Sequence, residues 1–287
     1  MVRYLVTGAG GMLGRDLVTA LNALNGADVV AAARTELDVT DLAAVRAATR
    51  GVDVVLNAAA FTRVDDAESE EAAAFAINAT GAGNVALAAA EVGATLVHYS
   101  TDYVFDGTAT SPYQEKHPTH PVTAYGRTKA SGERLVLESG PARTFLLRTA
   151  YLYGEHGPNF VKTMLRLAGD RETVSVVTDQ VGQPTWTADV ASQTVALLGS
   201  DAAPGIYHAT NSGSASWFEF ARAIFEFAGL DPERVLPTDS EHYVQRAPRP
   251  RYSVLGHRAW GNADLPEQRD WRKALQVAAE RGIIGAR

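Results

Sequence analysis

The strongest constraint on the fold is a glycine-rich segment that joins an apolar strand to an apolar helix near the N-terminus. Residues 4–7 read as a β-strand, residues 8–14 are GAGGMLG, and apolar residues then recur at helical spacing through residue 24. Glycine permits the tight turn and the close approach of a pyrophosphate, and the helix N-terminus offers unpaired N–H groups. We therefore expect Gly8, Gly11 and Gly14 to form a dinucleotide loop; a tight turn without a ligand is the weaker alternative.

The rest of the first half continues the alternation of strands and helices. Strand-like runs at 28–33, 52–57, 95–100 and 144–149 are separated by helical segments at 40–49, 72–92 and 124–138, and Thr40 is expected to cap the first of these helices. Short, nearly continuous apolar strands between helices are typical of a parallel sheet covered on both faces. The predicted fold class is α/β, with a doubly wound parallel sheet.

The second half has a looser rhythm. It contains helical segments at 159–168, 189–198 and 217–228, strands at 174–178 and 205–209, and a Pro- and Arg-rich loop at 245–252. We predict a dinucleotide-binding Rossmann domain over residues 1–150, to which parts of 179–210 return. Residues 151–287 are expected to form a smaller, interleaved substrate-binding domain.

Charge and residue usage exclude several classes of function. The formal net charge is −7 and no basic run is present, which argues against nucleic acid as a partner. The chain has no cysteine, so disulfides and thiolate metal sites are excluded. We find no export signal and no uninterrupted apolar stretch of about 18 residues, and therefore expect a cytoplasmic protein without a membrane segment.

The end of the second predicted strand bears on the choice of cofactor. Dinucleotide folds usually place Asp or Glu there to bind the adenosine ribose, whereas this chain reads Ala31–Ala33 followed by Arg34. A guanidinium binds phosphate through two parallel hydrogen bonds. We predict NADPH over NADH; the alternatives are that Arg34 is a solvated loop residue and that NADH is used.

Tyr125 and Lys129 are four residues apart at the start of a predicted helix, so they share one face. A phenol with a pKa near 10 is a poor proton donor at neutral pH, and a nearby cation lowers that pKa. We expect Lys129 to have this effect. Thr101 follows a predicted strand at the sheet edge where ligands bind, and is the third candidate, donating to the reacting oxygen while Tyr125 protonates it.

Several of these segments together resemble the extended short-chain dehydrogenases, and within them the dTDP-4-dehydrorhamnose reductases. They are the glycine loop, residues 57–60 (NAAA), HYSTDYVF at 98–105, the Tyr125–Lys129 pair, RTAYLYG at 148–154, Asn159–Phe160 and DQVGQPT at 179–185. The resemblance implies reduction of the C4 ketone of a nucleotide-linked 4-keto-6-deoxyhexose, first of all dTDP-4-dehydro-L-rhamnose, by a monomer or homodimer.

The resemblance also implies roles for individual residues. Gly11, Met12 and Leu13 would contact the pyrophosphate, Asp38 and Val39 the adenine, and Ala60, Phe61, Thr62 and Tyr99 the rest of the cofactor groove. Tyr125 and Lys129 would also bind the nicotinamide ribose. The sugar would meet Thr101, Asp102, Tyr125, Tyr151 and Asn159, and Arg249 in the late loop is a candidate for the substrate's diphosphate.

Two departures from the family pattern limit this transfer. The acid after the second strand is missing, and Tyr151 stands where the family has a tryptophan near the sugar. A reductase for another dTDP-deoxysugar of a natural product therefore stays open, as does a non-catalytic regulatory subunit with the same fold. Asp16 and Asp189 are the carboxylates that would hold the intersubunit Mg²⁺ of some relatives, but too few further ligands are present to predict a metal site.

Overall fold

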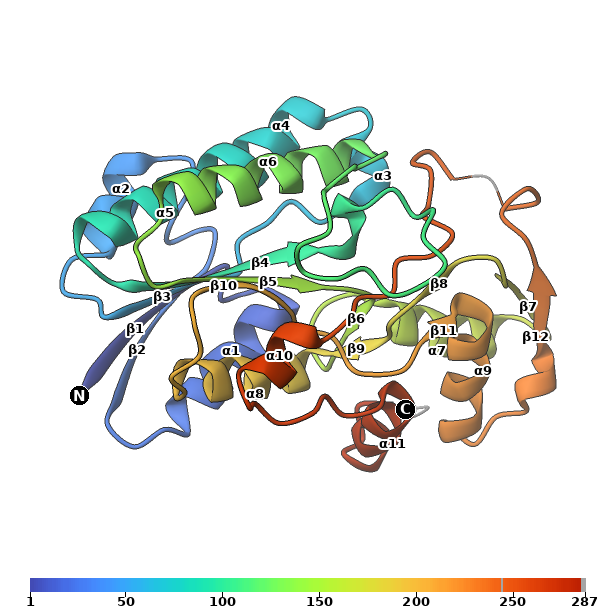
Figure 1. Ribbon diagram of the computed structural model, residues 1–287. Helices are drawn as coiled ribbons and strands as arrows, with labels where there is room; N and C mark the ends of the chain where they lie inside the picture. Colours follow the sequence, from blue (N-terminus) through green and yellow to red (C-terminus); the bar gives the residue numbers. More distant parts are fainter. Residues whose placement is uncertain (244, 285–287) are drawn as a thin grey trace.

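A single six-stranded sheet, all of whose strands run parallel, forms the centre of the protein (Figure 1). The computed structural model describes residues 1–243 and 245–284. In sheet order the strands are β2 (Ala27–Ala32), β1 (Val2–Thr7), β3 (Val54–Asn57), β4 (Thr95–Thr101), β5 (Thr144–Thr149) and β10 (Gly205–His208).

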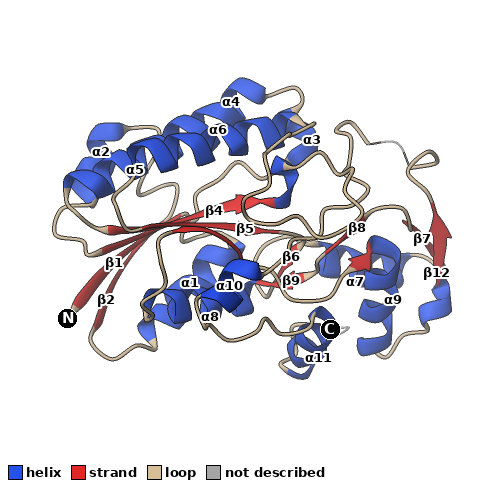
Figure 2. Ribbon diagram, viewed as in Figure 1, coloured by secondary structure: helices blue, strands red, loops and turns tan. Residues whose placement is uncertain are grey.

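Helices cover both faces of this sheet (Figures 1 and 2). One face carries α2 (Leu42–Ala48), α4 (Glu71–Phe75), α5 (Ala82–Glu91) and α6 (Ala124–Ser139), and the other carries α1 (Met12–Asn22), α8 (Thr187–Leu198) and α10 (Arg258–Asn262). The predicted doubly wound α/β fold is confirmed.

The side chains of the central strands divide between two apolar cores, one on each face of the sheet. Leu5 and Val55 pack with the α2 and α5 side, whereas Val6 and Leu56 pack with α1 and α8, and all four are fully buried. Successive residues of a strand point to opposite faces, so a strand between two helical layers is apolar at every position. This explains the continuous apolar runs in the sequence.

Two helices differ from the sequence-based expectation. The predicted cap Thr40 is wrong: the Asp41 carboxylate accepts from the N–H groups of Ala43 and Ala44, because helix α2 begins two residues later. The predicted helix over 72–92 is interrupted by a π-helical segment, η1 (Ala76–Gly81).

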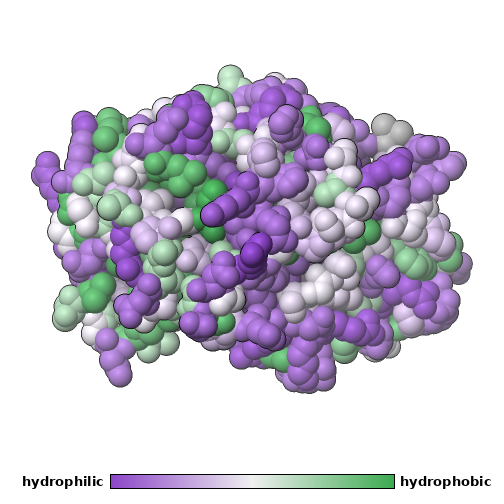
Figure 3. Space-filling model, in the orientation of Figure 1, coloured by the Kyte–Doolittle hydropathy of each residue, from purple (hydrophilic) through white to green (hydrophobic). Residues whose placement is uncertain are grey.

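The composite helix Glu71–Glu91 is long and apolar enough to cross a membrane by length and composition alone. However, Asn78, Thr80 and Asn84 interrupt its apolar residues, and 50% of its apolar 18-residue segment is buried inside the fold. Packing against the sheet accounts for this composition. The face shown in Figure 3 is largely hydrophilic, and apolar residues appear there only in separate small patches.

The second half of the chain builds a separate apolar core beyond the carboxyl ends of the strands. Residues of α7 (Phe160–Asp170), α9 (Trp217–Phe227) and α11 (Trp271–Glu280) pack there on β7 (Val174–Val177), which pairs with β12 (Val235–Thr238). Short strand pairs connect this region to the sheet: β6 (Leu152–Tyr153) with β9 (Thr185–Trp186), and β8 (Val181–Gly182) with β11 (Ala215–Ser216). Between them, α8 and β10 return to the central sheet.

The carboxyl ends of β1 and β3 mark the point where the connections change direction. The chain leaves β1 toward β2 on one side, and β3 lies on the other side. Ligands bind in the crevice at such a point in doubly wound sheets. The loops after β1, β3 and β4 all meet at this edge.

Candidate active site

The loop after β1 has the backbone that a pyrophosphate requires. Gly8 has a φ of +67°, and a Cβ there would lie 2.6 Å from the amide nitrogen of Ala59 in the loop after β3. Gly11 caps α1 without any side-chain hydrogen bond, so the first-turn N–H groups point toward the loop without a capping side chain. A Cβ on Gly14 would lie 2.3 Å from the Gly8 carbonyl oxygen. These three positions fit a bound dinucleotide.

The end of β2 contains a carboxylate that sequence reasoning missed. Glu36 folds back so that its side chain accepts from the Ala33 N–H at 2.7 Å. The expectation of no acid at this strand end is therefore wrong, because Glu36 reaches it from three residues further along. Arg34 and Asp38 are exposed beside it, and Val39 is buried against Gly81.

The loop after β3 is held by Asn78, which no sequence argument singled out. Its carboxamide accepts from the Phe61 N–H at 2.8 Å, and donates to the Phe61 carbonyl at 3.1 Å and to Thr128 at 3.0 Å. The Asn78 carboxamide therefore makes the two hydrogen bonds to the Phe61 backbone that a neighbouring strand would make. Phe61 is buried beside Tyr125, while Ala60 and Thr62 are more accessible.

Thr101, Tyr125 and Lys129 come together at the edge of the sheet. Thr101 ends β4, while Tyr125 and Lys129 lie on the first turns of α6, which Thr123 caps through the Gly126 N–H. The Tyr125 phenol lies close enough to the Thr101 side chain for the threonine to lower the pKa of the phenol. Lys129 is 2% exposed and donates through Nζ to the Tyr99 carbonyl oxygen at 2.6 Å.

Burial shifts the pKa values of both Tyr125 and Lys129. Burial raises the pKa of Tyr125, an effect that the Thr101 hydrogen bond opposes and that the Asp102 charge reinforces. Burial also lowers the pKa of Lys129 to about 8, against the attraction of Glu133. In the free protein, desolvation dominates the pKa of Tyr125 and the Lys129 ammonium is directed at the Tyr99 carbonyl. The effect of Lys129 on the phenol in the presence of the nicotinamide stays a prediction.

The Tyr99 side chain extends away from this cluster. Its hydroxyl is hydrogen-bonded to Thr194 of α8 at 2.9 Å, in the core on the opposite side of the sheet from α6. The backbone carbonyl of Tyr99, rather than its phenol, is the group that faces Lys129.

Asp102 is 1% exposed and bonded on both oxygens. Oδ1 accepts from the Thr101 hydroxyl at 3.0 Å, and Oδ2 accepts from the hydroxyl of Ser253 at 2.5 Å. Burial raises the pKa of Asp102 to about 6, although these hydrogen bonds oppose the shift. The carboxylate thus ties the end of β4 to the late loop, 151 residues further along the chain.

Tyr151 has an unusual backbone and a covered ring. Its φ is +45°, a conformation that bulky residues rarely adopt. The ring is stacked on Trp217 of α9, with centroids 3.8 Å apart and planes within 9°. A Cβ on Gly182 would lie only 2.5 Å from the same ring. The Trp217 indole thus covers one face of the Tyr151 ring.

The two remaining predicted substrate residues are engaged within the fold. Asn159 caps α7 through the Lys162 N–H at 3.1 Å and donates to the Gly154 carbonyl at 2.9 Å. The guanidinium of Arg249 is paired with Asp65 at 2.6 Å, and its predicted contact with the substrate's diphosphate stays a prediction. Asp65 also accepts from the Ala247 N–H at 3.1 Å, and so holds this part of the late loop.

In the described part of the chain, no group of three or more His, Asp or Glu side chains is arranged to hold a metal ion. Asp189 accepts from the Asn211 amide at 2.7 Å and lies 3.5 Å from the Arg269 guanidinium. Burial raises the pKa of Asp16.

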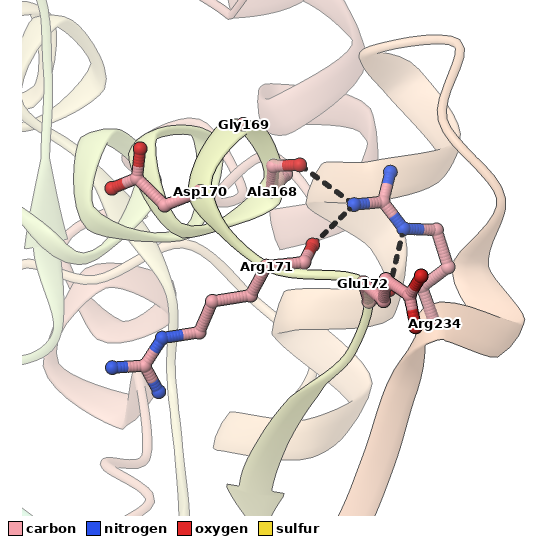
Figure 4. Close-up of a pocket in the computed structure, with 6 residues that line it drawn as sticks. All are labelled: Ala168, Gly169, Asp170, Arg171, Glu172 and Arg234. Carbon is pink, nitrogen blue, oxygen red and sulfur yellow. Dashed lines mark hydrogen bonds between the residues drawn. The ribbon is translucent and has the colours of Figure 1, made fainter.

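A surface pocket at the end of α7 is unrelated to these residues (Figure 4). It is lined by Arg234 and residues 168–172, and the guanidinium donates to the carbonyl oxygens of Ala168, Arg171 and Glu172 at 2.6 to 2.8 Å. Arg234 thus caps the last carbonyls of the helix, which is a structural role.

Comparison with known proteins gives a consistent result. The family model described as "RmlD substrate binding domain" matches residues 2–283. A dTDP-4-dehydrorhamnose reductase of Streptomyces griseus is 52% identical over 279 residues, covering 95% of this chain and 91% of that protein. A dTDP-4-keto-6-deoxy-D-glucose reductase of Streptomyces niveus is 49% identical, covering 96% of each. The crystal structure of dTDP-4-dehydrorhamnose reductase from Bacillus anthracis in complex with NADP superimposes with a TM-score of 0.91 at 40% identity, covering 96% of this chain and 98% of that one.

Proposed function

Because the chain belongs to the RmlD substrate binding domain family, we propose that it reduces the C4 ketone of a dTDP-linked 4-keto-6-deoxyhexose with NADPH. The first candidate reaction converts dTDP-4-dehydro-L-rhamnose to dTDP-L-rhamnose. The resemblance seen in the sequence motifs is confirmed by the family match and by the named relatives.

The observation that carries this proposal is the convergence of Thr101, Tyr125 and buried Lys129 with the glycine loop at one edge of the sheet. When bound there, NADPH supplies the hydride that C4 of the sugar accepts. The ketone oxygen then needs a proton, and Tyr125 is placed to donate it.

A raised pKa suits Tyr125 for this step. The phenol stays protonated throughout the neutral range, so the proton is present when the substrate arrives. Hydride addition turns the ketone oxygen into an alkoxide, which is a stronger base than a phenolate and takes the proton. Lys129, charged below a pKa of about 8, would hold the nicotinamide ribose and stabilise the phenolate that is left.

The groove residues receive their roles on the same basis. Gly8, Gly11 and Gly14 would hold the pyrophosphate with Met12 and Leu13, and Arg34 the 2′-phosphate of NADPH; the B. anthracis relative is described in complex with NADP. Asp38, Val39, Ala60, Phe61, Thr62 and Tyr99 would complete the groove, and Tyr151, Asn159 and Arg249 would flank the substrate.

The proposal extends to the domains, the location in the cell and the oligomeric state. Residues 1–150 with α8 and β10 would form the cofactor domain, and residues 151–287 mainly the substrate domain. The protein would act in the cytoplasm, as a monomer or homodimer.

A second candidate substrate is a different dTDP-4-keto-6-deoxy sugar. A relative of nearly equal identity is named for dTDP-4-keto-6-deoxy-D-glucose, and the Tyr151 ring lies between Gly182 and Trp217 instead of standing free. The aromatic surface beside the sugar therefore differs from the single tryptophan that the family resemblance implies.

A substrate screen tests the proposal. NADPH oxidation by the purified protein is followed with dTDP-4-dehydro-L-rhamnose, with dTDP-4-keto-6-deoxy-D-glucose and with their UDP analogues. We expect turnover with the dTDP-4-keto sugars, fastest with the first. Absence of turnover on every 4-keto sugar nucleotide would instead favour the regulatory-subunit alternative.

A further inference from the structure

The Thr101 hydroxyl has a single proton, and the structure shows where that proton goes. Thr101 Oγ1 donates to Asp102 Oδ1 at 3.0 Å and accepts from the Tyr103 N–H at 3.2 Å. A hydroxyl offers one donor and two acceptor sites. With the proton committed to Asp102, Thr101 has nothing to donate to a ketone oxygen in this state.

Reduction needs the opposite arrangement. Both Thr101 and Tyr125 must direct a proton at the ketone oxygen, so Thr101 has to stop donating to Asp102. A protonated Asp102 allows this, because its own O–H then donates to Thr101 Oγ1 and frees the threonine proton for the substrate. Oδ2 of Asp102 keeps its bond from Ser253 in both states.

We propose that Asp102 is a positioning residue whose protonated form orients the Thr101 hydroxyl toward the substrate ketone, with Ser253 setting how readily that form is reached. This inference rests on the proposed reductase function. It assigns Asp102 a role through Thr101, in place of the direct sugar contact that the family resemblance implies, because the carboxyl is 1% exposed and both of its oxygens are bonded within the protein.

The surroundings make Asp102 the group that titrates in the acid to neutral range. Tyr103 beside it, Tyr125 from α6 and Tyr151 after β5 all sense its charge, and burial raises the pKa of each, so they stay neutral. Arg249, in the late loop, opposes the rise in the pKa of Tyr103 and of Tyr151. Burial raises the pKa of Asp102 itself to about 6, whereas Lys129 on α6 has a pKa of about 8 and donates to a different group.

The pH dependence of kcat/KM for ketone reduction tests the proposal, since it reports ionisations of the free enzyme. The parent is expected to lose activity by up to about tenfold per pH unit above a midpoint near 6. The side-chain amide introduced by Asp102→Asn can donate to Thr101 at every pH. We therefore expect this variant to lack the falling limb of the pH profile near 6 and to have a higher kcat/KM than the parent at pH 8. A limb with a midpoint near 8, assigned to Lys129, would remain in both.

Ser253→Ala provides an independent test that leaves the carboxyl in place. The Ser253 hydrogen bond lowers the pKa of Asp102, so its loss raises that pKa and moves the falling limb to higher pH, by about one unit for a bond to a charged group. Asp106→Asn is the matched control: this aspartate lies four residues from Asp102 and bonds Tyr113 instead, and its profile should equal the parent's.

Two results would overturn the proposal. One is an Asp102→Asn protein that binds NADPH but keeps the parental limb or has no activity at any pH. The other is a Ser253→Ala profile that does not move or moves to lower pH. A ¹³C NMR titration of the Asp102 carboxyl, assigned by its loss in Asp102→Asn, needs no turnover: a midpoint near 6 supports the proposal and one below about 4.5 contradicts it, even if the proposed reductase function itself fails.

Discussion

At the residue scale, Lys129 combines a buried ammonium with a single hydrogen bond to a backbone carbonyl. Its pKa is lowered by burial from 10.5 to about 8, which corresponds to a destabilisation of the folded state by about 3 kcal/mol when the residue is charged. The unfolded chain binds more protons than the folded one between pH 8 and 10.5, so this group's contribution to stability is unfavourable below pH 8 and improves as the pH rises through that window.

We therefore expect Lys129→Met to be more stable than the parent at pH 7 and inactive as a reductase. The difference in the free energy of unfolding, about 3 kcal/mol at most, should shrink between pH 8 and 10.5, as measured by urea unfolding at several pH values. A difference in the free energy of unfolding that stays constant from pH 8 to 10.5 would show that burial does not destabilise the charged form of Lys129.

Arg34 is the residue on which the preference for NADPH depends. Arg34 is exposed beside the Glu36 carboxylate at the end of β2. A bound 2′-phosphate would therefore contact one cation, Arg34, and lie near one anion, Glu36. Arg34→Ala should lower kcat/KM for NADPH by about tenfold to a hundredfold and leave that for NADH nearly unchanged. Arg50→Ala, which replaces another exposed arginine in the connection between α2 and β3, serves as the control. An unchanged NADPH-to-NADH ratio in Arg34→Ala would remove this residue from cofactor recognition.

At the element scale, α6 approaches the π-helical segment η1 very closely. A Cβ on Gly132 would lie 2.0 Å from the Asn78 carbonyl oxygen, and Asn78 in turn holds both polar groups of the Phe61 backbone. The glycine in α6 therefore lets one helix set the position of the loop after β3. The π-helical turn places Asn78 where its side chain reaches that loop.

Gly132→Ala is expected to lower the free energy of unfolding by about 1 to 3 kcal/mol and to weaken NADPH binding, because η1 and the Phe61 loop must shift together. Thermal unfolding and a fluorescence titration with NADPH measure the two effects. Gly169→Ala in α7, where a Cβ meets nothing within 4 Å, should instead stabilise by about 0.5 to 1 kcal/mol. Equal stability of Gly132→Ala and the parent would show that the two helices can separate without cost.

At the scale of the whole molecule, the sequence predicts those features that depend on local residue patterns. The glycine loop, the alternating strands and helices and the four-residue spacing of Tyr125 and Lys129 are local, and they led to the fold class and to the centre of the site. The contacts that adjust the site span the chain: Asp102 with Ser253, Arg249 with Asp65, and Tyr151 with Trp217. A single sequence has no periodicity that records such pairs.

The pKa values of the site residues also depend on the whole fold. The four-residue spacing correctly places Lys129 near Tyr125, but the pKa of each group depends on how much water the whole fold removes from around it. Burial raises the pKa of the phenol and lowers that of the ammonium, and both effects come from elements far away in the chain. Desolvation is a property of the assembled molecule.

The central claim, that Tyr125 donates the proton in a ketone reduction at this site, is tested most directly by single-turnover oxidation of NADPH with dTDP-4-dehydro-L-rhamnose in the parent and in Tyr125→Phe. The substitution removes the hydroxyl and keeps the ring that packs beside Phe61. We predict a loss of at least about a hundredfold in the rate, the usual contribution of a positioned proton donor, with NADPH binding retained. A Tyr125→Phe protein that turns over at the parental rate would contradict the account.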